Sequence, residues 1–379
     1  MEHLIKKQII KQNLKKKANK YFSFINKKTI FFSVLIAIIV IILSYSIYER
    51  NKNKNYDKKN CDCGLPENHT KLETQDIETI ESGIPPESFE REILDKIKYK
   101  IQGKSVIIVQ QLYFINGLIR KYKPKKIIEI GVCSGGTSAA ILNAINDIEG
   151  AMLYSCDLEK KHYFKSYFDV GYVVNDYFPQ FKNKWKLYTG NTTAAFIDEI
   201  GKDIDFAFID TAHVMPGEVL NVIEILPFLK KNAIIAFDDI NDQAKSYIYG
   251  LDFFYPCNNL LISVLRGKKI IFEQSKNKPF DFKKLGAIIL DDNQEKYYYD
   301  YFYLLSNNWS YMPREFEIAT IRNFIEKYYD QYYLQMFDKA VQINYERLKK
   351  KGLLDKDYFL YTYPHLIKNR KRPSYNSSL

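Results

Sequence analysis

The stretch Lys125–Ser138, with the sequence KKIIEIGVCSGGTS, decides the fold of this chain. Its apolar run Ile127–Ile130 predicts a buried parallel strand that ends at Gly131. A glycine-rich turn and an apolar helix follow, and Thr137 or Ser138 is the expected N-cap of that helix. A strand, a glycine turn and a helix N-terminus bring backbone N–H groups close to a ligand, so the stretch predicts a nucleotide-binding site.

Two common nucleotide patterns do not fit this turn. A phosphate-binding Walker loop requires lysine where Thr137 stands. The dinucleotide pattern G-x-G-x-x-G does not match the spacing of Gly131, Gly135 and Gly136. The pattern E-x-G-x-x-x-G-G, beginning at Glu129, fits without a gap. The alternative is an ordinary strand-to-helix turn of an α/β protein.

Further apolar runs predict strands that each end in polar residues. The strands and the residues that follow them are Ala151–Cys156 with Asp157, Lys184–Thr189 with Asn191, Ile204–Ile209 with Asp210, and Ala233–Phe237 with Asp238 and Asp239. Ligands bind at the carboxyl ends of the strands in an open parallel sheet. An acid at the position of Asp157 suits the ribose hydroxyls of a nucleoside. Asn191 could contact an adenine ring or could be a plain turn residue.

Three carboxylates and one histidine are expected at the same edge of the sheet. Asp210, Asp238 and Asp239 repel one another unless they are protonated or share a cation, and oxygen ligands of this kind suit Mg²⁺. The alternative is that some of them cap helices or face water. His213, three residues after Asp210, is a candidate acceptor for a hydroxyl proton, or a histidine that only stabilises a helix start.

The remaining patterns complete an α/β fold. Leu260–Leu265 and Lys269–Phe272, joined by a turn at Gly267, predict an antiparallel hairpin. The fold class is therefore a Rossmann-like, mostly parallel sheet of seven strands with helices on both faces. Helical patterns are expected within 89–122, and Tyr297–Leu305 and Ile318–Tyr345 predict a tyrosine-rich C-terminal extension. This extension could pack over the sheet, cover the substrate or form the face of a homo-oligomer.

The sequence resembles the class I S-adenosylmethionine (SAM) methyltransferases over roughly residues 105–275, and most closely their small-molecule and sugar O-methyltransferase branch. The resemblance rests on Glu129–Ser138, Phe208–His213 and Phe237–Asp239. It implies SAM as the cofactor, with Glu129, Gly131, Ser134, Gly135, Asp157 and Asn191 in its site. In the related metal-dependent enzymes it implies Mg²⁺ on Asp210, Asp238 and Asp239. The catechol enzymes carry a catalytic lysine where this chain has His213.

The N-terminal part predicts a membrane anchor. Thr29–Tyr48 contains no charged residue, and twenty helical residues span about 30 Å, the thickness of the hydrocarbon core of a bilayer. Nine lysines precede the span, so a single-pass protein with a cytoplasmic N-terminus is expected. The side of the membrane that carries the catalytic domain stays open, because SAM is drawn from the cytoplasmic pool.

Composition narrows the remaining function classes. The net charge is +11, but much of the excess lies in the first 28 residues, and no nucleic-acid-binding motif accompanies it, so nucleic acid is not expected as a partner. Five scattered cysteines do not form a disulfide framework. The expected organisation is a basic tail (1–28), a transmembrane helix (29–48), a polar linker (49–88), a methyltransferase domain (89–275), a helical extension (276–350) and a basic tail (351–379).

The function predicted from the sequence is SAM-dependent methyl transfer to an oxygen of a glycan or small molecule. His213 and Asp210 are the expected catalytic pair. Two alternatives remain open at this stage. One is a membrane-tethered binding or scaffold protein that keeps the fold without turnover, and the other is a metal-dependent enzyme that uses the fold without methylating.

Overall fold

The computed structural model describes residues 77–81, 109–162, 167–240, 255–273 and 285–354. All of them belong to one compact unit, Thr74–Leu379. No helix in these described ranges is long and apolar enough to cross a membrane. The predicted transmembrane helix at 29–48 and both basic tails, apart from 351–354, lie outside them.

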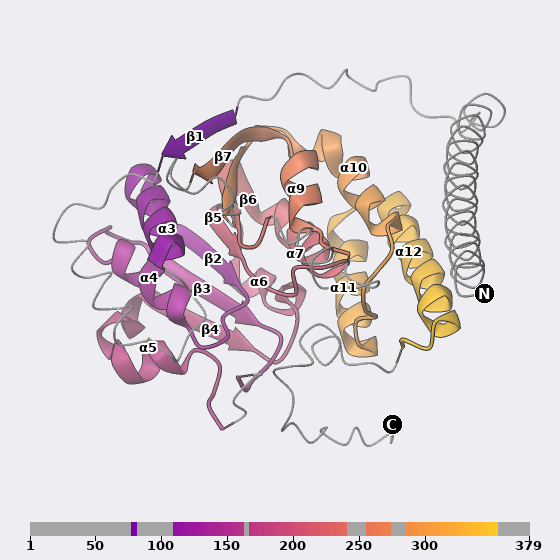
Figure 1. Ribbon diagram of the computed structural model, residues 1–379, viewed down its shortest axis with the longest axis horizontal. Helices are drawn as coiled ribbons and strands as arrows, with labels where there is room; N and C mark the ends of the chain where they lie inside the picture. The colour runs from indigo at the N-terminus through magenta and orange to yellow at the C-terminus, as the bar shows by residue number, and fades with distance from the viewer. Residues whose placement is uncertain (1–76, 82–108, 163–166, 241–254, 274–284, 355–379) are drawn as a thin grey trace, which may run out of the picture. The chain divides into compact units, whose positions relative to one another are not determined.

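The centre of the molecule is an eight-stranded sheet (Figure 1). Its strands are β1 (Ile77–Glu81), β2 (Lys126–Ile130), β3 (Met152–Asp157), β4 (Trp185–Thr189), β5 (Ile204–Ile209), β6 (Leu229–Phe237), β7 (Gly267–Glu273) and β8 (Gly286–Leu290). Their order across the sheet is β1-β7-β8-β6-β5-β2-β3-β4. Among the described strands, β8 alone runs antiparallel to its neighbours. The predicted mostly parallel, seven-stranded core is confirmed, and β1, from the stretch predicted as a linker, adds an eighth strand beside β7.

Helices cover both faces of the sheet, as predicted. They are α3 (Val109–Tyr122), α4 (Gly136–Ala144), α5 (Tyr172–Tyr177), α6 (Ile197–Ile200), α7 (Gly217–Ile225), α9 (Asn258–Val264), α10 (Tyr298–Tyr303), α11 (Glu315–Tyr328) and α12 (Gln331–Lys350). Side chains alternate along each strand, so Phe206 and Phe208 of β5 pack on one side with α3, α4 and α5. Ala207 and Ile209 pack on the other side with α7 and the C-terminal helices (Figure 1). Two apolar cores therefore hold the sheet.

The predicted hairpin over 260–272 is wrong. Its first half, Leu260–Leu265, lies mostly in helix α9, which covers Asn258–Val264. Its second half forms β7, whose antiparallel partner is β8, a strand from the segment predicted as a helical extension. A short apolar run has the same composition in a buried strand and in a buried helix, so its period alone could not separate the two.

The helix after the glycine turn begins without a side-chain cap. Its N-cap position is Gly135, at φ 87°, and Thr137 and Ser138 lie inside the first turn. The predicted capping role of these two residues is therefore wrong. The Ser138 hydroxyl instead donates to the carboxylate of Glu129, at 2.6 Å, and ties the helix to β2.

The C-terminal extension packs onto the sheet layer. The pattern over Ile318–Tyr345 splits into α11 and α12 at Tyr329 and Asp330, whose backbones are extended. The Tyr329 hydroxyl donates to the carbonyl of Ile223 in α7, at 2.6 Å. Trp309, just before α11, has no exposed surface. The extension is therefore part of the apolar core on the α7 side.

Candidate active site at the carboxyl edge of the sheet

The glycine turn begins where two strands approach each other closely. Gly131 has φ +90°, and a Cβ atom placed there would lie 2.0 Å from the carbonyl oxygen of Asp210. Its N–H donates to Cys156, while the Asp210 N–H donates to Ile130, each at 2.9 Å. Only glycine fits, and its conformation leads the chain out of β2 beside the first residue after β5.

Residues at the start of α5 lie against the turn. The N–H groups of Gly171 and Val173 donate to the carbonyls of Cys133 and Ser134, each at 2.9 Å. Gly135 has φ +87°, and a Cβ atom there would lie 3.0 Å from the Cα of Gly171. The predicted cofactor residues Ser134 and Gly135 therefore lie in a turn that is held from both sides.

Asp157 organises this turn. One carboxylate oxygen accepts hydrogen bonds from the N–H groups of Val132 and Cys133, and the other accepts from Glu159, all at 2.9 Å. Burial raises the pKa of Asp157, and these three donors oppose the rise. A carboxylate offers about four acceptor positions, so three backbone bonds leave room for one more donor. Asp157 as a whole residue is only partly buried, which is compatible with a ribose hydroxyl.

Glu129 lies beneath the turn with no exposed surface. One of its oxygens accepts from the hydroxyls of Ser138 and Ser155, each at 2.6 Å, and Ser155 in turn accepts from the indole N–H of Trp185 at 2.8 Å. Burial raises the pKa of Glu129 to about 7. Through these hydrogen bonds Glu129, a predicted cofactor residue, connects β2 with β3 and α4.

Asn191 follows β4 at the same edge. Its side-chain oxygen accepts from the N–H of Thr192, at 2.8 Å, which makes a local turn. The adjacent short 3₁₀ helix, Thr193–Ala195, is held by the buried carboxylate of Glu224, which accepts from the N–H of Ala194 at 2.8 Å. The structure thus shows Asn191 as a turn residue, and its contact with adenine stays a proposal.

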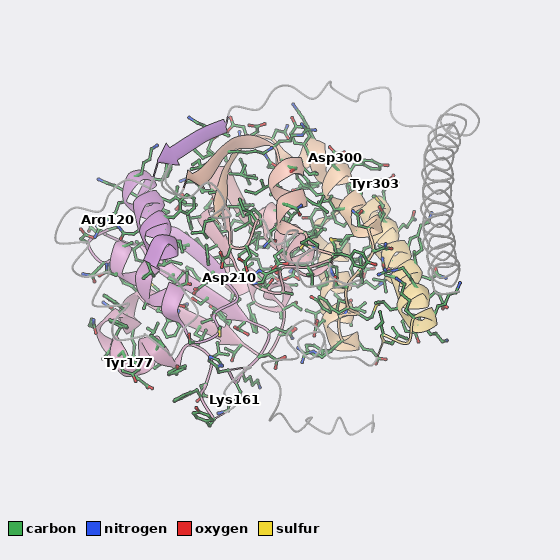
Figure 2. All side chains as sticks on the ribbon, in the orientation of Figure 1. Arg120, Lys161, Tyr177, Asp210, Asp300 and Tyr303 are labelled. Carbon is green, nitrogen blue, oxygen red and sulfur yellow. The ribbon has the colours of Figure 1, made fainter. Side chains whose placement is uncertain are left out.

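The second half of the site is a histidine surrounded by carboxylates. His213 Nε2 lies 3.5 Å from Asp210 Oδ1 and 3.8 Å from Asp239 Oδ2. On its other side, Nδ1 lies 3.6 Å from Glu218 Oε1. Asp210, labelled in Figure 2, lies between the strands and the C-terminal helices. The structure therefore brings together the predicted catalytic pair and Asp239, as expected from adjacent strand ends.

These carboxylates control the protonation of the histidine. Burial alone would lower the pKa of His213, but the negative charges of Asp210, Glu218, Asp239 and Asp238 outweigh it and raise the pKa to about 9. Burial, with the charge of Asp238 next, raises the pKa of Asp210 well above its usual value. The cluster therefore retains protons at neutral pH, and its titration belongs to the coupled groups rather than to one residue.

Mg²⁺ is not shown to bind this arrangement. It requires close to six oxygen ligands at about 2.0–2.1 Å. Within the ranges that the structure describes, no three His, Cys, Asp or Glu side chains are arranged to hold a metal ion. One ring nitrogen of His213 already contacts both Asp210 and Asp239, two of the three carboxylates that the resemblance assigns to the ion.

Glu218 is a site residue that the sequence analysis missed. It has no exposed surface, and it accepts hydrogen bonds from the hydroxyl of Thr211, the N–H of His213 and the thiol of Cys257. His213 has φ +61°, and the bond to Glu218 holds this left-handed conformation. The only signal in the sequence was an acid in the first turn of a predicted helix, a position where acids are ordinary.

A sequence family described as "Methyltransferase domain" matches residues 128–240, which is under a third of the chain. The match begins in β2 and ends just after Asp239, so it contains the glycine turn, Asp157, Asn191 and the His213 cluster. No curated protein matches the chain.

Several solved structures are similar in fold. The O-methyltransferase TomG from Streptomyces achromogenes, in complex with SAM, is 12% identical and has a TM-score of 0.38, covering 52% of this chain and 90% of its own. An O-methyltransferase from Bacillus cereus with SAH is 15% identical, with a TM-score of 0.38 and coverage of 54% and 92%. The SAH-bound methyltransferase PaMTH1 from Podospora anserina is 20% identical, with a TM-score of 0.38 and coverage of 55% and 90%.

At these TM-scores the assignment rests on the family match and not on the structural neighbours. The matched segment carries the glycine turn and the acid at the end of the following strand, in the geometry described above. Residues 128–240 are therefore similar to a methyltransferase domain.

Proposed function

We propose that the protein transfers the methyl group of SAM to an oxygen of a small molecule or glycan. The observation that carries the proposal is the placement of two different sites on one sheet edge. The glycine turn held by Asp157 lies at the ends of β2 and β3, and the His213–Asp210 pair lies at the adjacent end of β5. A methyl donor at the first site would face an acceptor at the second.

The cofactor half would bind SAM through the turn and the strand ends. Gly131, Ser134 and Gly135 would let the backbone approach the methionine end, and the remaining acceptor position of Asp157 would take a ribose hydroxyl. Asn191, after β4, would lie beside the adenine. When bound, SAM supplies an electrophilic methyl group on a positively charged sulfur. The chain's part is to hold donor and acceptor in line, which supplies much of the rate gain in such transfers.

The acceptor half would handle the proton of the attacking hydroxyl. As the oxygen forms its new bond to carbon, its proton would pass to the His213–Asp210 pair. His213 Nε2 is the candidate atom, because it faces Asp210 and Asp239, whose negative charges stabilise an imidazolium. The raised pKa of His213 makes it a strong base that must first lose its own proton. No step of this scheme uses a metal ion.

The chemical class of the methyl acceptor is proposed from the predicted membrane anchor. A membrane span at 29–48 would hold the enzyme at a membrane surface, where glycans and lipid-linked small molecules are concentrated. The absence of charge over twenty residues supports the span. After cell fractionation, the full-length chain is expected in the membrane fraction. Detergent should release it, whereas high salt or alkali should not. Release by alkali alone contradicts the anchor.

Methyl transfer is tested with the full-length chain in detergent. Titration calorimetry with SAM comes first, followed by measurement of SAH release with panels of phenols, free sugars and glycolipids. SAH release that depends on an oxygen acceptor, and that persists in EDTA, is expected. Absent SAM binding refutes the proposal. SAM binding without turnover on any panel supports the scaffold alternative, and loss of activity in EDTA with recovery in Mg²⁺ supports the metal-dependent one.

A further inference from the structure

The segment Trp309–Glu317 contacts both halves of the candidate site although it lies outside the family match. It precedes and begins helix α11, about seventy residues beyond the matched stretch that ends at 240. Its start is fixed to α12: the Trp309 N–H donates to the side chain of Asn344 at 2.9 Å, and the Arg347 guanidinium donates to the Trp309 carbonyl. We call this segment the strap.

The strap binds the acceptor half of the site near its start. The Ser310 N–H donates to the carbonyl of Met215, at 2.8 Å, and the Ser310 hydroxyl accepts from the N–H of Tyr255 at 2.9 Å. Met215 lies two residues after His213, in the loop that Glu218 holds. The strap and the histidine loop are therefore joined through backbone groups.

The strap binds the cofactor half near its other end. Arg314 Nη1 lies 3.1 Å from the carboxylate of Glu159, and Arg314 Nε donates to the buried carboxylate of Glu317. The guanidinium also lies over the ring of Phe316, 4.8 Å from its centroid. Two carboxylates and one aromatic face thus fix a planar cation in a single orientation.

Glu159 connects this cation to the cofactor turn. Its N–H donates to the carboxylate of Asp157, which holds the glycine turn through Val132 and Cys133. The next residue, Lys160, accepts from the N–H of Val170 at 3.1 Å, and the adjacent Gly171 donates to Cys133 of the turn at 2.9 Å. A shift of Glu159 therefore changes both the acid proposed for the ribose and the Val170–Gly171 contacts with the turn.

We propose that Arg314 is a positioning residue for SAM: through Glu159 it sets the place of the Asp157 carboxylate. The inference rests on the proposed function, since it concerns the same cofactor. The inference also extends the proposed function, because it makes the C-terminal extension a part of the cofactor site. Arg314 does not touch the reacting atoms and acts only by holding the turn.

The test compares variants of the full-length chain by SAM calorimetry and by kinetics. Arg314→Gln is expected to weaken SAM binding about fivefold, the scale of a partly exposed ion pair. Glu159→Gln is expected to give the same loss, and the double variant no more than either single one. The KM for SAM should rise while kcat at saturating SAM stays within about twofold.

The matched control is Arg322→Gln. Arg322 lies in α11, which begins just after Arg314, and it pairs in two places with Asp338 of α12, at 3.0 and 3.1 Å. Its replacement should lower the melting temperature and leave SAM affinity unchanged. Arg314→Lys should recover part of the affinity, because the charge returns without the guanidinium fork.

The outcomes separate this inference from the proposed function. A wild-type chain that does not bind SAM overturns both. A wild-type chain that binds SAM while Arg314→Gln and Glu159→Gln bind equally well overturns the positioning role alone. Equal losses in Arg322→Gln and Arg314→Gln also overturn it, because the effect would then be one of general stability. Should Arg314→Gln fail to fold, Glu159→Gln, whose side chain is half exposed, carries the same expectation.

Discussion

Single carboxylates carry much of the proposed chemistry. Asp157 accepts three backbone N–H groups, and the residue as a whole is only partly buried. Glu218, by contrast, is fully buried and shapes the His213 loop. The first holds a site open to a ligand, while the second holds a residue in a conformation that it would otherwise avoid.

Replacement of Asp157 separates its proposed role in SAM binding from its role in holding the glycine turn. Asp157→Asn keeps the shape but removes the charge and one acceptor, so SAM affinity is expected to fall at least about tenfold, with a smaller loss of stability. Calorimetry with SAM and a thermal melt measure the two effects. Asp169→Asn, at an exposed ion pair with Lys161, is the matched control and should change neither. Unchanged affinity in Asp157→Asn contradicts the ribose role.

The pH dependence of the reaction follows from His213. Neighbouring carboxylates raise its pKa to about 9, so at neutral pH most molecules hold the proton that a base must lose. The value of kcat/KM is therefore expected to rise about tenfold per pH unit below pH 9 and to level off above it. His213→Gln should abolish this rise below pH 9 and most of the rate. A profile that is flat from pH 6 to pH 9 rules out the histidine as base.

At the scale of elements, the glycine turn is fixed by space as well as by conformation. Gly131 and Gly150 both have positive φ, but a Cβ atom at Gly131 would meet the Asp210 carbonyl at 2.0 Å, and one at Gly150 would meet nothing within 4 Å. Gly150→Ala is expected to cost about 1 kcal/mol of unfolding free energy, and Gly131→Ala at least about 3 kcal/mol. Urea denaturation of both variants measures the difference. Equal costs would mean that conformation alone requires glycine.

Sequence patterns predicted the elements that have local signals. The strand ends that carry Asp157, Asp210 and Asp239 could be placed together because parallel strands share a carboxyl edge. The pairing of β7 with β8 could not be predicted, because a strand's partner depends on contacts between residues distant in sequence. The helix at Leu260 could not be predicted either, because its short apolar run fits a strand equally well. The contact of Arg314 with Glu159 has no sequence signal, because surface charges occur throughout the chain.

The whole molecule has buried acids whose ionisation opposes folding. Burial raises the pKa of Glu129 to about 7 and that of Glu224 to about 8, from an ordinary value of 4.5. Between the ordinary and raised values the folded state holds a proton that the unfolded state has lost, so stability falls as the pH rises from about 4.5 to about 8.

Glu224→Gln tests this dependence. Glutamine imitates the protonated acid, so the variant should be more stable than the wild type at pH 8 and nearly equal to it at pH 4.5. Its stability curve should also be flatter between these values. Urea denaturation across the range measures it, and Glu199→Gln, an exposed acid, is the control. A curve parallel to that of the wild type would show that Glu224 is already ionised in the folded protein.

The fluorescence of the two tryptophans of the chain can report on the cofactor turn and on the C-terminal helices. The Trp185 indole is hydrogen-bonded to Ser155, which donates to Glu129, so its emission should change as Glu129 loses its proton near pH 7. Trp309 is buried at the start of the strap, with its indole on the Leu305 carbonyl. Trp309→Phe leaves an internal fluorophore that monitors the base of the cofactor turn. Trp185→Phe leaves one that reports when the C-terminal helices detach.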